Sequence, residues 1–364
     1  MLRQIDNTKL NRGERTLRRC MLAKELEEAG NYEAARVAMG ELWQRIGENP
    51  VLDGLDKHIA AEVLMRAGAL TGWIGSVNQV EGAQAKAKDL ISESILLFES
   101  LPDVIKVAEA RTEIAYCYWR EGAFDEARIT LGEALSYLTE ANSELKAVAL
   151  LRSAIVEISD QRFNDALRIF TEAAPLFEET ANHSFKGRFH VGLANTLKNL
   201  GTNEKREDYI DRAFIEYSAA SYHFEQAGHT SYRAAVENNL GFLFSKAGKF
   251  DEAYKHLDRA RHLFTSLKDK VHSAQVDDTQ ARALLAQGYK ADAERIIRSA
   301  VQVLEKGGEQ ALLTEALTTQ GVALARLEQQ EQSRSVLERA IEVAEQAGDI
   351  EGAGRAALTL IEEL

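Results

Sequence analysis

Small and apolar residues recur along this chain in a fixed three-position pattern. A small residue is followed four positions later by a bulky apolar residue, and three positions after that by alanine. The six instances are Ala127-Leu131-Ala134, Ala166-Phe170-Ala173, Ala213-Tyr217-Ala220, Ala253-Leu257-Ala260, Ala293-Ile297-Ala300 and Ser333-Leu337-Ala340. The intervals between their first members are 39, 47, 40, 40 and 40. Positions i, i+4 and i+7 share one helical face, and a period near 40 is typical of stacked helix pairs. The pattern therefore predicts an all-α solenoid.

Turn residues between the apolar segments divide this solenoid into units. Glycine tolerates the left-handed conformation that commonly ends a helix, and Gly30, Gly122, Gly248 and Gly288 stand at such positions. We expect a single domain over residues 1–364, made of eight helix pairs and a terminal helix at 349–364. The predicted pairs cover residues 14–47, 51–100, 103–140, 142–180, 182–227, 229–267, 269–307 and 309–347.

Two of the predicted pairs are irregular. In the second, Gly68, Gly72 and Gly75 interrupt the first helix, so we expect that helix to end early and a longer loop to follow. In the fifth, the polar residues 202–208 read as an insert between the two helices. Such an insert would account for the one interval of 47.

Composition narrows the classes of partner. The net charge of −13 over 364 residues argues against broad nucleic-acid binding, which needs lysine and arginine to displace counterions. It suits a basic peptide partner, or it is ordinary solubility charge. Cys20 and Cys117 form no CxxC pair, as expected of buried thiols in a reducing compartment. No secretion signal or apolar span is visible, so we expect a cytoplasmic protein with no membrane partner.

The residues around the fourth instance of the pattern carry a family resemblance. In order, they show a leucine-glycine pair, an aromatic residue at the turn, and then alanine, a bulky residue and alanine. These are Asn238-Asn239-Leu240-Gly241-Phe242-Leu243-Phe244, Gly248-Lys249-Phe250-Asp251-Glu252-Ala253, Leu257 and Ala260. The order resembles the tetratricopeptide repeat, which implies a right-handed superhelix. The usual period is about 34 residues; the longer one here is similar to that of bacterial signalling regulators and kinesin light chains.

The resemblance also implies a binding surface. In the family, the first helix of each pair lines a concave groove, and its exposed positions contact an extended or helical peptide. Carried over to this chain, the groove residues are Thr112, Tyr116, Trp119, Asn238, Asn239, Phe242, Asp278, Thr279, Arg282, Thr318 and Thr319. An amide such as Asn239 suits a peptide backbone because it both donates and accepts. The alternative is structural: the asparagines bond neighbouring helices, and Tyr116 and Trp119 pack between repeats.

Catalytic motifs do not accompany the repeats. The eight histidines form no HExxH set, and the chain contains neither a GxSxG elbow nor a GxxxxGK[ST] loop. We expect no enzyme activity, no metal and no cofactor. The many aspartates and glutamates are expected to form mainly a solvated face.

Three functions remain open. The first is an adaptor or sensor that captures a protein or peptide segment, as the regulatory part of a bacterial signalling system. The second is a receptor for a small ligand or signalling peptide that changes the superhelix. The third is a scaffold that self-associates through helix 349–364, whose apolar stripe contains Leu358, Leu360, Ile361 and Leu364. That stripe is a poor end for an array unless the helix is a cap, and we favour a longer parent protein.

Overall fold

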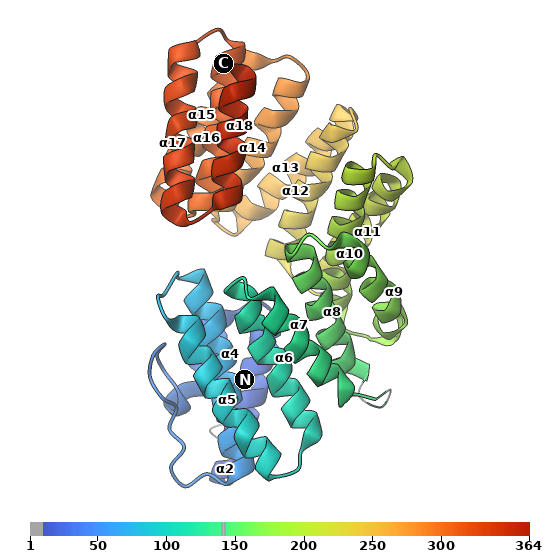
Figure 1. Cartoon of the computed structure of the whole chain (residues 1–364), viewed down its shortest axis with the longest axis vertical. Coiled ribbons are helices and arrows are strands. Elements are labelled where there is room, and N and C mark those ends of the chain that lie inside the picture. Colours follow the sequence, from blue (N-terminus) through green and yellow to red (C-terminus); the bar gives the residue numbers. More distant parts are fainter. Residues whose placement is uncertain (1–9, 140, 142) are drawn as a thin grey trace. The chain divides into compact units, whose positions relative to one another are not determined.

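All regular structure in the described part of the chain is helical. The computed structural model describes residues 10–139, 141 and 143–364, and no strand occurs among them (Figure 1). Most of the helices follow one another as pairs joined by tight turns. The all-α helical-repeat fold predicted from the periodic pattern is therefore confirmed.

The chain divides into two compact units. Unit 1 spans residues 1–213 and unit 2 spans residues 214–364. In a repeat array each pair packs mainly on its neighbours, so no single core needs to extend from one end to the other. Separate clusters of buried apolar side chains within each unit fit this account.

Unit 1 contains four complete helix pairs and most of a fifth, whose last helix crosses the unit boundary. The first pair is short, and the 3-10 helix Gly40–Leu42 follows it. The helices are α2 (Arg12–Glu28), α3 (Tyr32–Met39), α4 (Lys57–Val77), α5 (Ala83–Ser100), α6 (Val104–Arg120), α7 (Phe124–Ser136), α8 (Ser143–Ser159), α9 (Phe163–Glu179), α10 (His183–Glu204) and α11 (Glu207–Gln226).

Unit 2 begins within α11 and contains three further pairs and a final helix. Its helices are α12 (Thr230–Lys246), α13 (Phe250–Ser266), α14 (Lys270–Ala286), α15 (Lys290–Gly307), α16 (Gln310–Arg326), α17 (Gln330–Ala347) and α18 (Ile350–Glu363). The final helix packs on both α16 and α17.

Short polar side chains begin many of these helices. Asn11 accepts a hydrogen bond from the backbone N–H of Glu14 at 2.9 Å, and the Glu14 carboxylate accepts one from the backbone N–H of Asn11. Aspartate caps α14 and α18, where Asp269 and Asp349 accept from backbone amides three residues on. Each such cap satisfies an amide that the helix itself leaves without an acceptor.

The three-position pattern forms the core of the repeats. Every member of the six instances is buried, with exposed fractions of 0 to 1%. Ser333 takes the place of alanine in the last instance because its hydroxyl donates to the carbonyl oxygen of Gly321 at 2.8 Å. Small residues at these positions let the second helix approach its neighbours, and the bulky residue fills the space between them.

The glycines of α4 serve close packing and do not end the helix, which corrects the sequence-based expectation. This helix runs unbroken through Gly68, Gly72 and Gly75 to Val77. A Cβ atom at Gly68 would lie 2.6 Å from the Ile91 side chain, and one at Gly75 would lie 2.2 Å from Ala83. Glycine lowers helix propensity, but here it allows α5 to lie directly against α4.

The predicted insert at 202–208 is likewise mostly helical. Helix α10 continues to Glu204, Lys205 adopts the left-handed conformation with φ 55°, and α11 begins at Glu207. The extra residues therefore lengthen the two helices of this pair to 22 and 20 residues. The interval of 47 reflects longer helices and not a loop.

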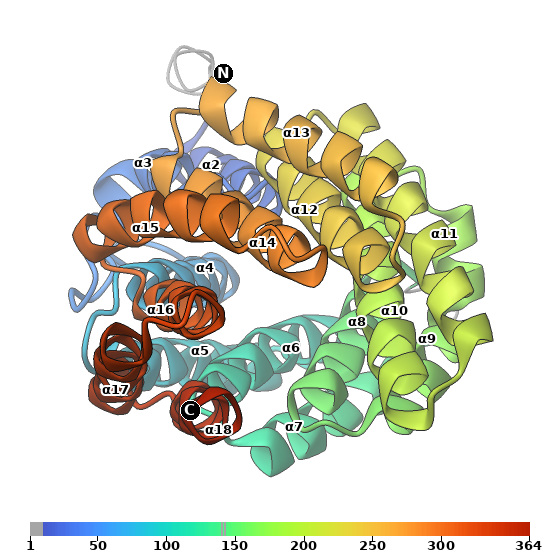
Figure 2. The same ribbon diagram turned by 90° about the horizontal axis from the view of Figure 1, so that it is seen from above.

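The first helix of each pair defines what we call the inner face of a unit. In Figure 2, α6 and α8 lie on the inner side of unit 1 and α7 and α9 on its outer side, and α12 likewise lies inside α13 in unit 2. Consecutive first helices contact one another within each unit. Among the described residues, no helix is long and apolar enough to cross a bilayer.

Candidate functional site

The structure places the three groove residues predicted on α6 at two depths. Thr112 is 1% exposed, and its hydroxyl donates to the carbonyl oxygen of Ala108 at 2.8 Å. Its side chain therefore offers little surface to a ligand, although we had expected it to be exposed. Tyr116 and Trp119 are half-buried and lie on the surface of the unit.

Tyr116 and Trp119 belong to a row of four aromatic rings, which we call the aromatic ladder. It also contains Tyr32 at the start of α3 and Trp73 near the end of α4. Neighbouring ring centroids are 5.1 Å apart for Tyr32 and Trp73, 4.9 Å for Trp73 and Tyr116, and 4.6 Å for Tyr116 and Trp119. The indole N–H of Trp119 donates to Ser159 Oγ of α8 at 2.7 Å. The ladder thus connects the first three helix pairs of unit 1 and reaches the fourth.

Beside the ladder, charged side chains join the first helices of four consecutive pairs. We call this group the charge cluster. It comprises Lys24 and Glu27 of α2, Glu62 and Arg66 of α4, Lys106, Glu109 and Glu113 of α6, and Arg152 of α8. Several of its members are almost completely buried, so these glutamates are exceptions to the expected solvated acidic face.

Each cation in the charge cluster has a carboxylate partner. Lys24 Nζ lies 2.6 Å from Glu109 Oε1, and Lys106 Nζ lies 2.9 Å from the other oxygen of Glu109. Arg66 pairs with Glu27 at 2.7 Å, where both side chains are 6% exposed or less. Removing one partner of such a buried pair leaves an uncompensated charge, which typically costs about 3–5 kcal/mol.

The charge cluster fixes the ionisation of its central glutamates. Burial opposes the ionised form of Glu109, but the nearby Lys24, Lys106 and Arg66 outweigh it and lower its pKa to about 2. For Glu113, burial is again the largest influence, and the adjacent Arg152 and Arg66 overcome it and lower the pKa. The carboxylates therefore remain charged at neutral pH and hold α4, α6 and α8 together.

Sequence reasoning missed the charge cluster, although the chain carries a signal for it. Glu27 and Arg66 are 39 positions apart in the sequence, and so are Glu113 and Arg152. Opposite charges separated by about one repeat fall on matching positions of adjacent first helices. Periodic analysis of charge, alongside that of apolar residues, would have found these pairs.

A further contact joins the first and fifth pairs of unit 1. Arg188 Nη2 of α10 donates to the backbone carbonyl oxygen of Glu28, the last residue of α2, at 2.6 Å. The carbonyl groups at a helix end lack a donor within the helix, and a cation there is favourable. This bond brings together helices whose bonded residues are 160 positions apart in the sequence.

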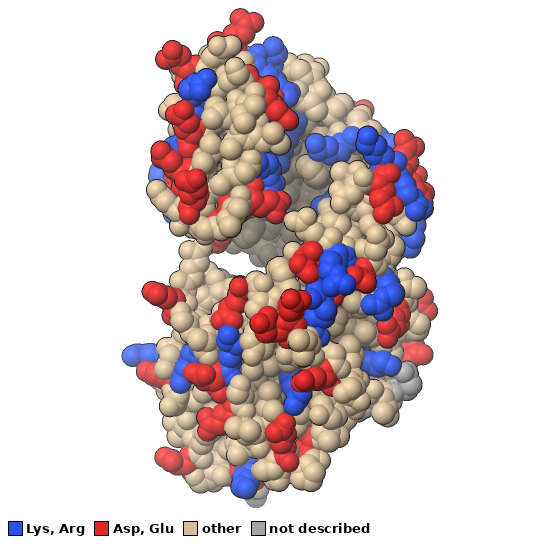
Figure 3. Space-filling model, viewed as in Figure 1, with Lys and Arg blue, Asp and Glu red and all other residues tan. Residues whose placement is uncertain are grey.

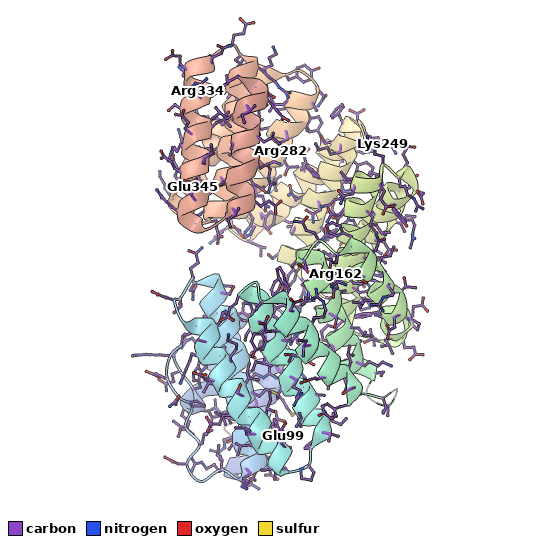
Figure 4. All side chains as sticks on the ribbon, in the orientation of Figure 1. Glu99, Arg162, Lys249, Arg282, Arg334 and Glu345 are labelled. Atoms are coloured by element: carbon purple, nitrogen blue, oxygen red, sulfur yellow. The ribbon has the colours of Figure 1, made fainter. Side chains whose placement is uncertain are left out.

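In unit 2, the predicted residues of α14 and α16 meet around Arg282, which Figure 4 labels. Arg282 Nη2 lies 2.8 Å from Asp278 Oδ2, and its Nε donates to Thr319 Oγ1 at 3.1 Å. Glu315 lies 3.5 Å away on α16. Arg282 thereby connects two first helices, and about a third of its side chain remains exposed.

The other predicted residues of unit 2 lie along the same first helices at different depths. Asn238 is 7% exposed, whereas Asn239 and Phe242 are half-buried. Thr279 is 6% exposed and bonds the carbonyl of its own helix, as half-buried Thr318 also does. Asn239, Phe242, Arg282 and Thr318 thus present side-chain surface, while the remaining residues are buried between helices.

Two buried side chains of unit 2 have an oxygen without a hydrogen-bond partner. These are Asn238 Oδ1 of α12 and Asp278 Oδ1 of α14, which lie one repeat apart in the sequence. A buried acceptor left without a donor costs about 1–3 kcal/mol. The two oxygens therefore have unused capacity to accept hydrogen bonds on neighbouring first helices.

A serine, a glutamate and a histidine also meet in unit 2, but not in an order that activates the serine. Ser221 Oγ donates to Glu237 Oε1 at 2.5 Å, and His256 Nδ1 lies 2.8 Å from Glu237 Oε2. Burial opposes ionisation of Glu237, yet the hydrogen bonds from His256 and Ser221 lower its pKa. Because the carboxylate separates the hydroxyl from the imidazole, the set does not provide a nucleophile and its base.

Other kinds of site find little support in the part of the chain that the structure describes. No group of three or more histidine, cysteine, aspartate or glutamate side chains is arranged to hold a metal ion among those residues. On the face shown in Figure 3, acidic and basic side chains are interspersed over each unit. On the first helices, the described side chains offer hydrogen bonding, ion pairing and aromatic contact.

Comparison with solved structures identifies similar folds. Aspartyl phosphate phosphatase F from Bacillus subtilis matches with a TM-score of 0.62 and 14% identity, over 94% of this chain and 86% of that one. The quorum sensor NprR from B. thuringiensis matches with a TM-score of 0.62 and 13% identity, over 93% and 90% of the two chains. The Rap conjugation gene regulator of plasmid pLS20, in complex with the Phr* peptide, matches with a TM-score of 0.53 and 15% identity, over 89% of this chain and 86% of that one.

Sequence comparison adds nothing to this result. No protein-family model matches the chain, and no curated protein matches it either. At 13–15% identity, the structural likeness establishes a shared fold. These neighbours are helical-repeat proteins of the tetratricopeptide type.

Proposed function

We propose that this chain, which has the tetratricopeptide-type helical-repeat fold, is a non-catalytic sensor or adaptor that captures a peptide segment on the inner face of its repeats. The observation that carries the proposal is the side-chain surface that Asn239, Phe242 and Arg282 present on the adjacent first helices α12 and α14. The amide of Asn239 would both donate to and accept from the backbone of an extended peptide. Arg282, partly exposed beside Asp278, would receive a peptide carbonyl or carboxylate.

The comparisons support this class of function. One similar structure is a quorum sensor, and another holds the Phr* peptide. Both belong to regulators of bacterial signalling, and both match about nine-tenths of this chain. The sensor version of the proposal adds that a captured peptide changes the arrangement of repeats, because contacts in such arrays are mainly local.

A peptide array tests the proposal. The full chain is applied to an array of synthetic decapeptides of varied sequence, and the dissociation constants of bound peptides are then measured by fluorescence anisotropy. We expect Asn239→Ala and Arg282→Ala to weaken binding roughly 10- to 100-fold, as loss of a good polar contact does. The melting temperature of these variants should stay close to that of the wild type.

The matched control is Asn164→Ala, which removes an exposed amide from the outer helix α9 and should leave binding unchanged. If no peptide on the array binds, or if both inner-face variants bind like the wild type, the proposal is wrong. For the sensor version, small-angle scattering should change when a bound peptide is added. If the scattering profile does not change, the sensor version is wrong and only the adaptor version remains.

Self-association through the last helix is a second candidate, which the surface of α18 favours. Ile350, Leu358 and Ile361 are 87%, 55% and 77% exposed, while Gly352 and Ala356 are buried against the unit. Exposed apolar side chains grouped on one helix are typical of an interaction surface. Light scattering measures the mass in solution. The mass of the wild type should exceed that of a monomer, and the double variant Leu358→Asp, Ile361→Asp should have the mass of a monomer. A wild-type chain that is monomeric at high concentration excludes this candidate.

A further inference from the structure

One cation on the inner face of unit 1 differs from all those in the charge cluster. Arg120, the last residue of α6, lies against the aromatic ladder. Its guanidinium carbon is 3.9 Å from the ring centroid of Trp73 and 4.6 Å from that of Tyr116. Within the part of the chain that the structure describes, Arg120 has no carboxylate at ion-pair distance, and its Nη2 is buried with no hydrogen-bond partner.

The lack of a partner is costly, so it calls for an explanation. Burial disfavours the charged guanidinium and is the main reason that the pKa of Arg120 is lowered, and the neighbouring Arg152 lowers it further. Contact with aromatic rings compensates only part of this cost. A guanidinium offers five N–H donors in a planar fork that matches a carboxylate. Arg120 therefore has unused capacity for an anion.

The helices around Arg120 are built to admit its side chain. A Cβ atom on Gly72 of α4 would lie 3.1 Å from Arg120 Nη1 and 3.2 Å from Gln84 Oε1. Gln84 is held in place because its Nε2 donates to the carbonyl oxygen of Gly72 at 2.8 Å. The absence of a side chain at Gly72 thus leaves room for the guanidinium, and Arg120 remains partly exposed to a ligand.

The surrounding charges indicate which kind of anion fits. The four cations of the charge cluster are paired with Glu27, Glu62, Glu109 and Glu113, and burial raises the pKa of both Glu27 and the nearby Glu28. Arg120 therefore adds about one positive charge to a region that is otherwise close to neutral. One charge suits a carboxylate, whereas a phosphate dianion would face the glutamates with only partial compensation.

We propose that Arg120, together with Trp73 and Tyr116, forms a carboxylate-binding subsite on the inner face of unit 1. The carboxylate pairs with the guanidinium, and an apolar side chain next to it packs on the aromatic ladder. This inference deepens the proposed function, since the carboxylate would belong to the captured peptide. It comes from the C-terminus of the peptide or from an acidic side chain, which offer the same chemistry.

The test uses small probes that differ only in the charged group. N-acetyl-phenylalanine carries a free carboxylate, and N-acetyl-phenylalanine amide does not. Binding to the full wild-type chain is followed by saturation-transfer NMR and by the fluorescence of its tryptophans. We expect the acid to bind roughly tenfold more tightly than the amide, as a charge-assisted hydrogen bond requires. Equal binding of acid and amide, or no binding of either at millimolar concentration, would overturn the proposal.

Variants assign the effect to Arg120. Arg120→Gln should abolish the preference for the acid, and Arg120→Lys should keep part of it. Arg295→Gln, which removes an exposed arginine of α15, is the control and should keep the full preference for the acid over the amide. A preference that survives in Arg120→Gln refutes the assignment. If Arg120→Gln does not fold, the comparison of acid and amide on the wild type still decides the proposal.

Further probes separate the sources of the anion and the two proposals. N-acetyl-glutamic acid α-amide presents a side-chain carboxylate, and stronger binding of this probe would indicate an internal acidic residue over a C-terminus. Inorganic phosphate should compete poorly; efficient competition would contradict the carboxylate assignment. If the acid is preferred but no array peptide binds, the subsite stands and peptide capture fails. If array peptides bind but the acid and the amide bind equally well, peptide capture stands and the carboxylate subsite is wrong.

Discussion

Replacement of Gly241 by alanine tests how closely the two helices of a repeat are packed. Gly241 lies on α12, where it faces Leu257 of α13. A Cβ atom at this position would lie 2.5 Å from Leu257 Cδ2, 2.6 Å from Leu257 Cγ and 3.2 Å from the carbonyl oxygen of Ala253. Carbon atoms in contact are ordinarily about 3.5–4.0 Å apart, so the whole leucine side chain must move.

Two effects of opposite sign set the size of the change. Alanine is favoured over glycine in a helix interior by about 1 kcal/mol. Overfilling a close-packed core costs roughly 1–3 kcal/mol, and Leu257, only 1% exposed, has little room to move. We therefore expect Gly241→Ala to lower the free energy of unfolding by up to about 2 kcal/mol, since the overlap outweighs the gain in propensity.

Native-state hydrogen exchange of the amides of α12 and α13 is the appropriate assay, because repeats can open locally. Gly132→Ala is the matched control: this glycine lies within α7, is exposed, and has open space where a Cβ atom would stand, with no neighbouring atom within 4 Å. It should stabilise α7 by up to about 1 kcal/mol. If Gly241→Ala also slows exchange, the contact with Leu257 does not limit packing, and our account of the repeat core is refuted.

Three further predictions concern buried groups. Ala253→Trp should lower the free energy of unfolding by roughly 1–3 kcal/mol, and unchanged urea unfolding would contradict the buried position of this alanine. The pKa of Glu109 is depressed from its usual 4.5 to about 2. Its ionisation therefore contributes stability above pH 4.5 that is lost as the pH falls toward 2. Glu109→Gln should be less stable than the wild type at neutral pH, with the difference narrowing in acid; a constant difference would refute this. Burial raises the pKa of Cys20 and Cys117 to about 12, so neither should react with a thiol reagent until urea unfolds the chain, and rapid labelling of native protein would refute their burial.

The repeated fold was accessible from sequence because its signal is local and periodic. Each small residue of the three-position pattern occupies the same buried place in its own repeat, such as Ala253 and Ala293, both 0% exposed. Polar patterning and turn glycines mark the helices between these positions. The glycines within α4 are ambiguous in the sequence, since Gly68 and Gly75 could equally break a helix or admit a neighbour. Only the position of α5 distinguishes the two.

The candidate site was predicted less completely. The resemblance pointed to Tyr116, Trp119 and Arg282, which the structure places on partly exposed surface, and also to Thr112, which is buried. Their binding roles remain predictions. A single sequence gives the helical face of a residue, but not how deeply the next helix covers it.

The sequence alone therefore determined that the chain forms stacked helix pairs, which helices come first in each pair, and which small residues face the core. The tertiary structure alone decided that Arg120 has no carboxylate beside it among the described residues, while Arg66 has one 2.7 Å away. In the sequence, Arg66 and Arg120 look alike, because both are arginines on first helices of unit 1. Their difference arises because the partner of Arg66 is Glu27, 39 positions earlier, and only the packing of α2 on α4 brings the two charges together.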